Sequence, residues 1–151
     1  MAEAVVDTVV LRYFLFVGRR NLLLALLGNP LMVPRAVFDP DEGDVPEGAM
    51  SEVTRSILVQ RRTAGDPGRL PEARAQAGRN AERLAAIHEM HGRGELRVVD
   101  LDEGELATFG RLTSKEGVRE LGLRFPLGAG EAACVALAVS RGWVLATDDT
   151  D

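Results

Sequence analysis

Short β-branched runs alternate with longer segments of helical periodicity along this chain. Four runs have the length and apolar content of buried strands, and strands are predicted at residues 4–10, 31–33, 95–101 and 143–147. Between them, apolar residues recur three and four positions apart, which predicts helices over residues 11–27, 51–62, 72–91, 103–112 and 130–141. The first run contains an acid, Asp7, and we expect the strand to end near it.

Two other parts of the pattern concern boundaries. Asp102 and Glu105 have the spacing of a capping box, in which two side chains and two backbone amides at a helix start satisfy one another. Residues 39–48 are rich in acids and turn residues and predict a loop. The segment 121–127 is left undecided between strand and loop, because Pro126 is unsuited to a central strand.

The order of these elements predicts the fold class. Strands that alternate with helices favour a parallel sheet covered on both faces, so we expect an α/β protein with a three-layer α/β/α arrangement in one domain, residues 1–151. Ligand sites in such sheets form at the carboxyl ends of the strands. Asp7 lies near the end of the first strand, Asp148 and Asp149 follow the last one, and Glu131 lies in the first turn of the preceding helix. These acids are expected to meet.

Composition restricts the class of protein. Of 151 residues, 46% are hydrophobic and 27% are charged, as in ordinary globular proteins. Arg19 and Arg20 interrupt the most apolar region, residues 11–33, which therefore lacks the ~20 continuous apolar residues of a membrane span. The first residues do not resemble a signal peptide, and the single cysteine, Cys134, predicts a buried apolar side chain rather than a disulfide. We expect a cytoplasmic protein without a membrane segment.

Charge is unevenly distributed along the chain. The net charge is −5, which argues against nonspecific binding to nucleic acid. Residues 51–93 nevertheless contain eight arginines against five acids, and arginine, whose planar fork suits phosphate, far outnumbers lysine. Residues 43–78 are therefore predicted to form an arginine-rich helical insertion. It either contacts a ligand or partner or is a solvated helical hairpin.

The acids allow both a structural and a chemical interpretation. Glu131 at a helix start is favoured by the helix dipole, and Asp148 and Asp149 could begin a turn. Asp7 is harder to explain in this way, because a buried carboxylate is costly unless hydrogen bonds or a cation compensate it. Carboxylates that converge need such compensation, and oxygen ligands indicate Mg²⁺ or Mn²⁺. These ions suit phosphodiester hydrolysis.

Four stretches together resemble a known family. They read "VVDTVVL", "VPRAVFDPDE", "LGAGEAACVALA" and "VLATDD", and they occur in the order found in PIN domains, over almost the whole chain. PIN domains are metal-dependent ribonucleases and include the toxins of many bacterial toxin–antitoxin pairs. The block that joins the last two stretches is fairly specific, whereas the first stretch alone would be weak.

The resemblance implies roles for individual residues. It makes Asp7, Glu131 and Asp149 the catalytic acids and ligands of Mg²⁺ or Mn²⁺, with Asp148 as a further ligand beside them. Two hydroxyl residues are expected to orient this site, Thr8 and Thr147.

The chain departs from the family pattern in two places. The second acid of the family would fall on Pro40, so it is expected to have moved to Asp39, Asp41 or Glu42, of which Glu42 is favoured as a metal ligand. Members of the family also continue beyond the "TDD" motif into a helix and usually a strand. We therefore expect either a C-terminally shortened PIN-like fold or a short member of the family.

The function implied by the resemblance is Mg²⁺- or Mn²⁺-dependent cleavage of single-stranded RNA by an endoribonuclease, of the kind that acts as a toxin. Arg61 and Arg62 in the insertion are the first candidates for contacts with RNA phosphates. An antitoxin protein and a second copy of the chain, forming a homodimer, are the further partners that the family implies.

Three other interpretations stay open. The main one is a PIN-like module that binds RNA or a protein without cleaving it. The stretch "GAGEAA" also matches a dinucleotide-binding motif, with Asp148 about 20 residues on, but leaves no room for the second half of such a domain. His88 and His91 have a spacing that can bind metal, yet no third ligand is near in the sequence, so they are expected at the surface or the edge of the core.

Overall fold

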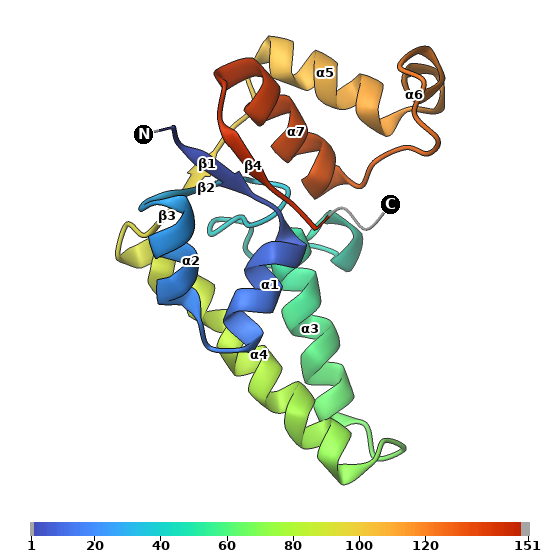
Figure 1. The fold of residues 1–151 in the computed structure, drawn as a ribbon. Coiled ribbons are helices and arrows are strands. Elements are labelled where there is room, and N and C mark those ends of the chain that lie inside the picture. Colours follow the sequence, from blue (N-terminus) through green and yellow to red (C-terminus); the bar gives the residue numbers. More distant parts are fainter. Residues whose placement is uncertain (1, 149–151) are drawn as a thin grey trace.

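The computed structural model describes residues 2–148 and is built around a parallel sheet (Figure 1). Its strand order is β3-β2-β1-β4, and every neighbouring pair is parallel. The strands are β1 (Ala4–Val6), β2 (Leu31–Pro34), β3 (Leu96–Val99) and β4 (Val144–Ala146). The predicted α/β class and the parallel sheet are therefore confirmed.

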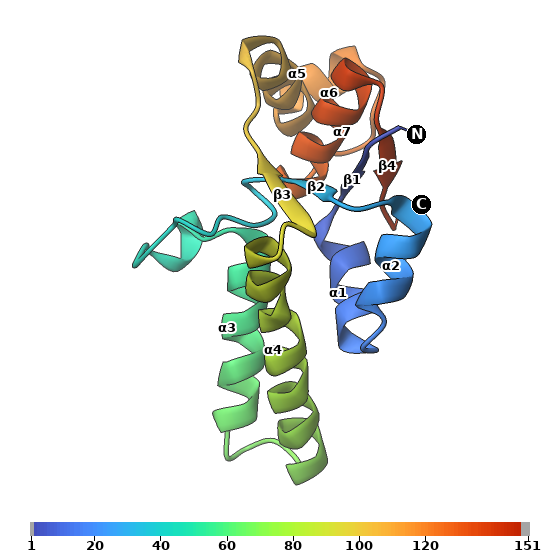
Figure 2. The ribbon, with the colours of Figure 1, turned by 90° about the vertical axis from the view of Figure 1, so that its left-hand side faces the viewer.

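Helices lie on both sides of this sheet, consistent with three layers (Figures 1 and 2). One group comprises α1 (Thr8–Phe16), α2 (Arg20–Leu27), α3 (Glu52–Gly65) and α4 (Pro71–Gly92). The other group comprises α5 (Glu103–Thr113), α6 (Lys115–Glu120) and α7 (Ala129–Arg141). Helix α7 contacts β1, β2 and β4, whereas α4 contacts β3. Within the described part of the chain, no helix combines the length and the hydrophobicity that a membrane span requires.

The core lies on the two faces of β1 and β2. Val5 and Val6 of β1 and Val33 of β2 are fully buried, and Leu137 of α7 and Leu11 of α1 pack in the same cluster. Burial on both faces explains why the strands read as unbroken apolar runs rather than alternating ones. Because the strands are parallel, the chain leaves all of them at the same edge of the sheet.

The first predicted strand is shorter than expected. It ends at Val6, and the predicted strand residues Val9 and Val10 belong to α1 instead. Asp7 causes this change, because its side chain caps α1 and accepts a hydrogen bond from the backbone N–H of Val10 at 3.0 Å. A local cap therefore outweighs the β preference of the valines.

The predicted helix over residues 11–27 is in fact two helices. The chain turns between α1 and α2 at Gly18, whose φ of +68° lies in the left-handed region that favours glycine. The short helix α6 was not predicted, and residues 121–127 form no strand. In α6, Gly117 lies against the backbone of Arg111 so closely that a Cβ atom would stand 2.2 Å from the carbonyl oxygen.

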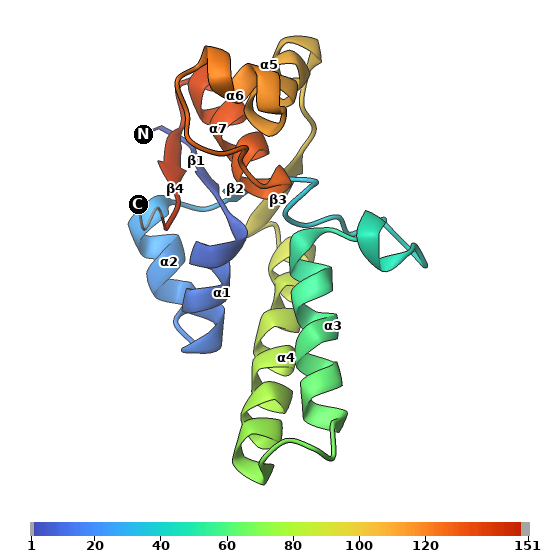
Figure 3. The same ribbon diagram turned by 90° about the vertical axis from the view of Figure 1, so that its right-hand side faces the viewer.

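The arginine-rich region forms a helical hairpin that projects away from the sheet (Figures 1 and 3). Helices α3 and α4 pack along each other, with Ala77 and Ala81 buried between them. The hairpin is longer than the predicted insertion, 43–78, because α4 continues to Gly92 and contacts β3 at its far end.

Candidate functional site

Asp7 joins the ends of two neighbouring strands. It follows β1, its backbone N–H donates to the carbonyl of Ala146 at 3.1 Å, and the residue is 6% exposed. One carboxylate oxygen caps α1, and the other accepts a hydrogen bond from the hydroxyl of Thr147 at 2.6 Å. The aspartate after β1 and the threonine after β4 therefore lie together, and the carboxylate is held in one orientation.

A second carboxylate, Glu52, lies next to this turn. The hydroxyl of Thr8 donates a hydrogen bond to one oxygen of Glu52. The other oxygen accepts a hydrogen bond from the backbone N–H of Gly130 at 2.8 Å. Glu52 begins α3, so this single side chain links the starts of α1, α3 and α7. Glu52 was not among the residues predicted for the site from the sequence.

The glycines at the start of α7 follow from this contact. A Cβ atom on Gly130 would stand 2.3 Å from an oxygen of Glu52, which is far closer than atoms can approach. A Cβ atom on Gly128 would lie 4.0 Å from Glu52, which is an ordinary contact. Gly130 is therefore required for Glu52 to reach the helix start, whereas Gly128 is not.

Glu131 follows Gly130 in the first turn of α7 and is half-buried. Glu131, Asp7 and Glu52 all influence the same side chain, Cys134, which lies one turn further along α7. Burial raises the pKa of the Cys134 thiol, and the negative charges of Asp7, Glu52 and Glu131 raise this pKa further. Three carboxylates therefore act on one buried side chain, whose thiol stays protonated and donates to the carbonyl of Val6 at 3.6 Å.

Two of these acids, Asp7 and Glu52, have no basic side chain paired with them in the described part of the chain. Their oxygen atoms, with those of Glu131, are the donors that hard divalent cations prefer. No cluster of three or more His, Cys, Asp or Glu side chains in the described part of the chain could hold a metal ion by itself.

Glu42, the residue favoured from the sequence as the second acid, contacts Ser51 and Thr54 rather than the Asp7–Thr8 turn. Its carboxylate accepts hydrogen bonds from the N–H of Ser51 at 2.7 Å, from the hydroxyl of Ser51 at 3.0 Å and from the hydroxyl of Thr54. These contacts satisfy the start of α3. Asp39 and Asp41, the alternatives, form ion pairs with Arg35 at 2.8 and 3.7 Å.

The three candidate acids Asp39, Asp41 and Glu42 are thus engaged in contacts that hold the loop after β2 in place. The residue that contacts the Asp7–Thr8 turn and α7 is Glu52. A signal for Glu52 was present in the sequence, because Ser51 precedes the apolar run of a helix and an acid in its first turn is typical.

The remaining candidates are dispersed. Asp148 is exposed, and Asp149 lies outside the described residues. Arg62 is held by Glu47 through two hydrogen bonds of 3.0 Å, whereas Arg61 is exposed and lies on a hollow that His88 also lines. His88 and His91 place their rings against Phe38, with centroids 5.2 and 5.9 Å away, at the edge of the core.

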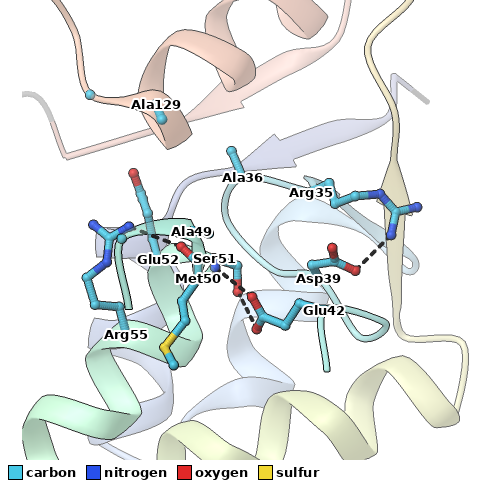
Figure 4. A pocket seen from close by; sticks show the side chains of 12 residues that line it. Arg35, Ala36, Asp39, Glu42, Ala49, Met50, Ser51, Glu52, Arg55 and Ala129 are labelled. Carbon is cyan, nitrogen blue, oxygen red and sulfur yellow. Dashed lines mark hydrogen bonds and ion pairs between the residues drawn. The ribbon is translucent and has the colours of Figure 1, made fainter. Parts of the chain in front are cut away.

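A cleft of about 500 Å³ opens beside Glu52 (Figure 4). Its walls come from the loop after β2, from the segment before α3 and from the start of α7. The charged side chains in it are Arg35, Asp39, Glu42, Glu52 and Arg55.

Comparisons with known proteins do not place the chain in a family. No model of a known protein family matches it, no curated protein sequence matches it, and no solved structure matches it.

Proposed function

We propose that this protein is a PIN-like endoribonuclease that cleaves single-stranded RNA with Mg²⁺ or Mn²⁺. The observation that carries the proposal is the bridge made by Glu52, which brings a carboxylate to the Asp7–Thr8 turn and to the start of α7, the helix that carries Glu131 in its first turn. Asp7, Glu52 and Glu131 are the proposed metal ligands, with Asp149 and Asp148 as the ligands contributed after β4. Glu52 thereby takes the role expected of Glu42.

The donor set supports this choice of cation. The site offers carboxylate and hydroxyl oxygens, its thiol is buried and protonated, and Asp7 and Glu52 have no basic partner among residues 2–148. A bound divalent ion would supply a water of lowered pKa and would stabilise charge on the phosphate oxygens.

The protein's own side chains hold the ligands in place. Thr147 and the N–H of Val10 fix the two oxygens of Asp7, and Thr8 and the N–H of Gly130 fix those of Glu52. Because these donors are part of the folded chain, the ligands need little reorganisation when the ion binds. No side-chain nucleophile is required by this chemistry.

Further parts of the proposal rest on the family resemblance. They are a toxin role with an antitoxin partner, a homodimer, and an outlying RNA contact at Arg61, which forms no ion pair in the described part of the chain. The competing proposal is a non-catalytic PIN-like module that binds RNA or a protein. It is favoured by the engagement of Asp39, Asp41 and Glu42 in loop contacts.

Cleavage of RNA separates the two proposals. A labelled single-stranded RNA incubated with Mn²⁺ should be cut by the protein, and EDTA should stop the reaction. Asp7→Asn should lower the rate at least ~100-fold, which corresponds to the loss of a few kcal/mol of transition-state stabilisation. RNA binding without cleavage under Mg²⁺ or Mn²⁺ would favour the non-catalytic module.

A further inference from the structure

One arginine in the cleft beside Glu52, Arg55, forms no ion pair with any acid among residues 2–148. Arg35 is bound by Asp39 and by Asp100, at 2.8 and 2.7 Å, so its charge is committed to the loop. Within the part of the chain that the structure describes, Arg55 instead donates only to the carbonyl oxygen of Met50, at 3.0 Å.

The acids of the cleft differ in their partners, and among the described residues only Asp39 forms an ion pair. Asp39 and Glu42 are engaged by Arg35 and by the start of α3, and Glu52 is fixed by Thr8 and Gly130. Within the described residues, neither the carboxylate of Glu52 nor the guanidinium of Arg55 forms an ion pair, so an anionic and a cationic group without ion-pair partners lie at the same cleft. The first suits a divalent cation, and the second suits an anion.

Their spacing on α3 places them on one side of the helix. Glu52 and Arg55 are three residues apart, which is about 4.5 Å along a helix axis, and residues at this spacing are neighbours on its surface. Figure 4 shows both side chains extending from α3 on the side of Ala129. The neighbouring wall carries Gly48, Ala49 and Gly128, two glycines and an alanine, which together add only one methyl group to the cleft.

We propose that Arg55 binds a backbone phosphate of the RNA strand in this cleft and so positions the strand against the carboxylates of Asp7, Glu52 and Glu131. This inference rests on the proposed function, since it assigns the substrate's path to that site. Arg55 can donate two or more hydrogen bonds to a phosphate, because one of its five guanidinium N–H groups donates to the carbonyl oxygen of Met50. Arg55 is exposed, so its replacement leaves the core intact.

Binding to a short fluorescein-labelled single-stranded oligouridylate tests the proposal in the full chain carrying Asp7→Asn. Arg55→Ala should raise Kd at least ~5-fold and reduce the slope of log K against log salt by about 0.7, the loss of one phosphate contact. Arg55→Lys should recover part of the affinity. The control, Arg79→Ala, removes the same charge from an exposed site on α4 and should change Kd less than ~2-fold.

The outcomes separate this inference from the proposed activity. Equal Kd changes for Arg55→Ala and Arg79→Ala would overturn the role of Arg55, even if the wild-type protein cleaves RNA. Affinity that depends on Arg55 in a protein that never cleaves would support the inference and contradict the nuclease. If the oligonucleotide does not bind at all, both fail. In a cleaving protein, Arg55→Ala should raise KM more than it lowers kcat.

Discussion

At the scale of single residues, the site depends on what each acid already contacts. Glu42 and Glu52 both lie near the start of α3, yet one satisfies the helix start and the other links α1 to α7. The sequence pattern locates acids near the sheet edge but not their partners, because the path of the loop from Pro40 to Met50 is not set by periodicity. The approach of Glu52 to Gly130 is a contact across 78 positions.

Replacing Gly130 and Gly128 one at a time should distinguish the effect of the Glu52–Gly130 contact on metal binding from the effect of helix propensity on stability. Gly130→Ala should abolish most of the rise in melting temperature that Mn²⁺ produces, because the new methyl group displaces the Glu52 carboxylate. Its effect on the metal-free protein should stay near ~1 kcal/mol, since lost hydrogen bonding is offset by the better helix propensity of alanine.

Gly128→Ala is the matched control. Its Cβ atom meets Glu52 only at 4.0 Å, so the response to Mn²⁺ should survive. Thermal melts with and without the ion, followed by circular dichroism, measure both effects. A full Mn²⁺ response in Gly130→Ala would show that the Glu52 contact does not matter to the site.

At the scale of elements, periodicity predicted every strand and the long helices, and local contacts decided the boundaries. The capping box at Asp102 and Glu105 was predicted and is present at the start of α5. The additional role of Glu105 was not predictable from its neighbours. Its buried carboxylate also binds Arg141, at the end of α7, through hydrogen bonds of 2.7 and 2.9 Å, and so ties α5 to the helix that carries Glu131.

This ion pair makes stability depend on pH in the acid range. The hydrogen bonds from Arg141 lower the pKa of Glu105 from 4.5 to about 2, against the opposing effect of burial. The stabilisation is therefore fully present above about pH 4.5 and is lost as the pH falls towards 2. Urea unfolding between pH 2 and 6 should show this loss.

Glu105→Gln provides the comparison. It should lower the free energy of unfolding at pH 7 by about 2 kcal/mol, because the buried side chain loses its charge-assisted hydrogen bonds with Arg141, whose guanidinium is partly exposed to water. The variant should also lose less stability than the wild type between pH 4.5 and 2. Parallel pH curves for the two proteins would mean that the pair does not govern acid stability.

At the scale of the whole molecule, a parallel sheet gathers residues from distant parts of the chain at one edge. Asp7, Thr147 and the start of α7 meet there because β1 lies between β2 and β4 and all strands point the same way. This much of the site follows from the order of elements alone. The hairpin of α3 and α4, which projects away from the sheet (Figure 3), contributes Glu52 from the first residue of α3.

Repulsion among the gathered carboxylates should make stability sensitive to metal. Asp7→Asn should leave the melting temperature of the metal-free protein unchanged or raised, because asparagine also caps helices and removes one negative charge. Mn²⁺ should raise the melting temperature of the wild type and have little effect on this variant. Equal metal shifts in the two proteins, measured by differential scanning calorimetry, would argue against Asp7 as a ligand.

The most direct test of the metal site is a calorimetric titration of Mn²⁺ into the wild type, Glu52→Gln and Glu42→Gln. Glu52→Gln should bind Mn²⁺ at least ~10-fold more weakly than the wild type, as expected when an acid that forms the site is lost. Glu42→Gln should bind like the wild type, although it melts at a lower temperature because Ser51 and Thr54 lose hydrogen bonds to a charged acceptor. The account would be contradicted if Glu52→Gln bound Mn²⁺ as tightly as the wild type while Glu42→Gln bound it more weakly. Glu42, and not Glu52, would then be the metal ligand.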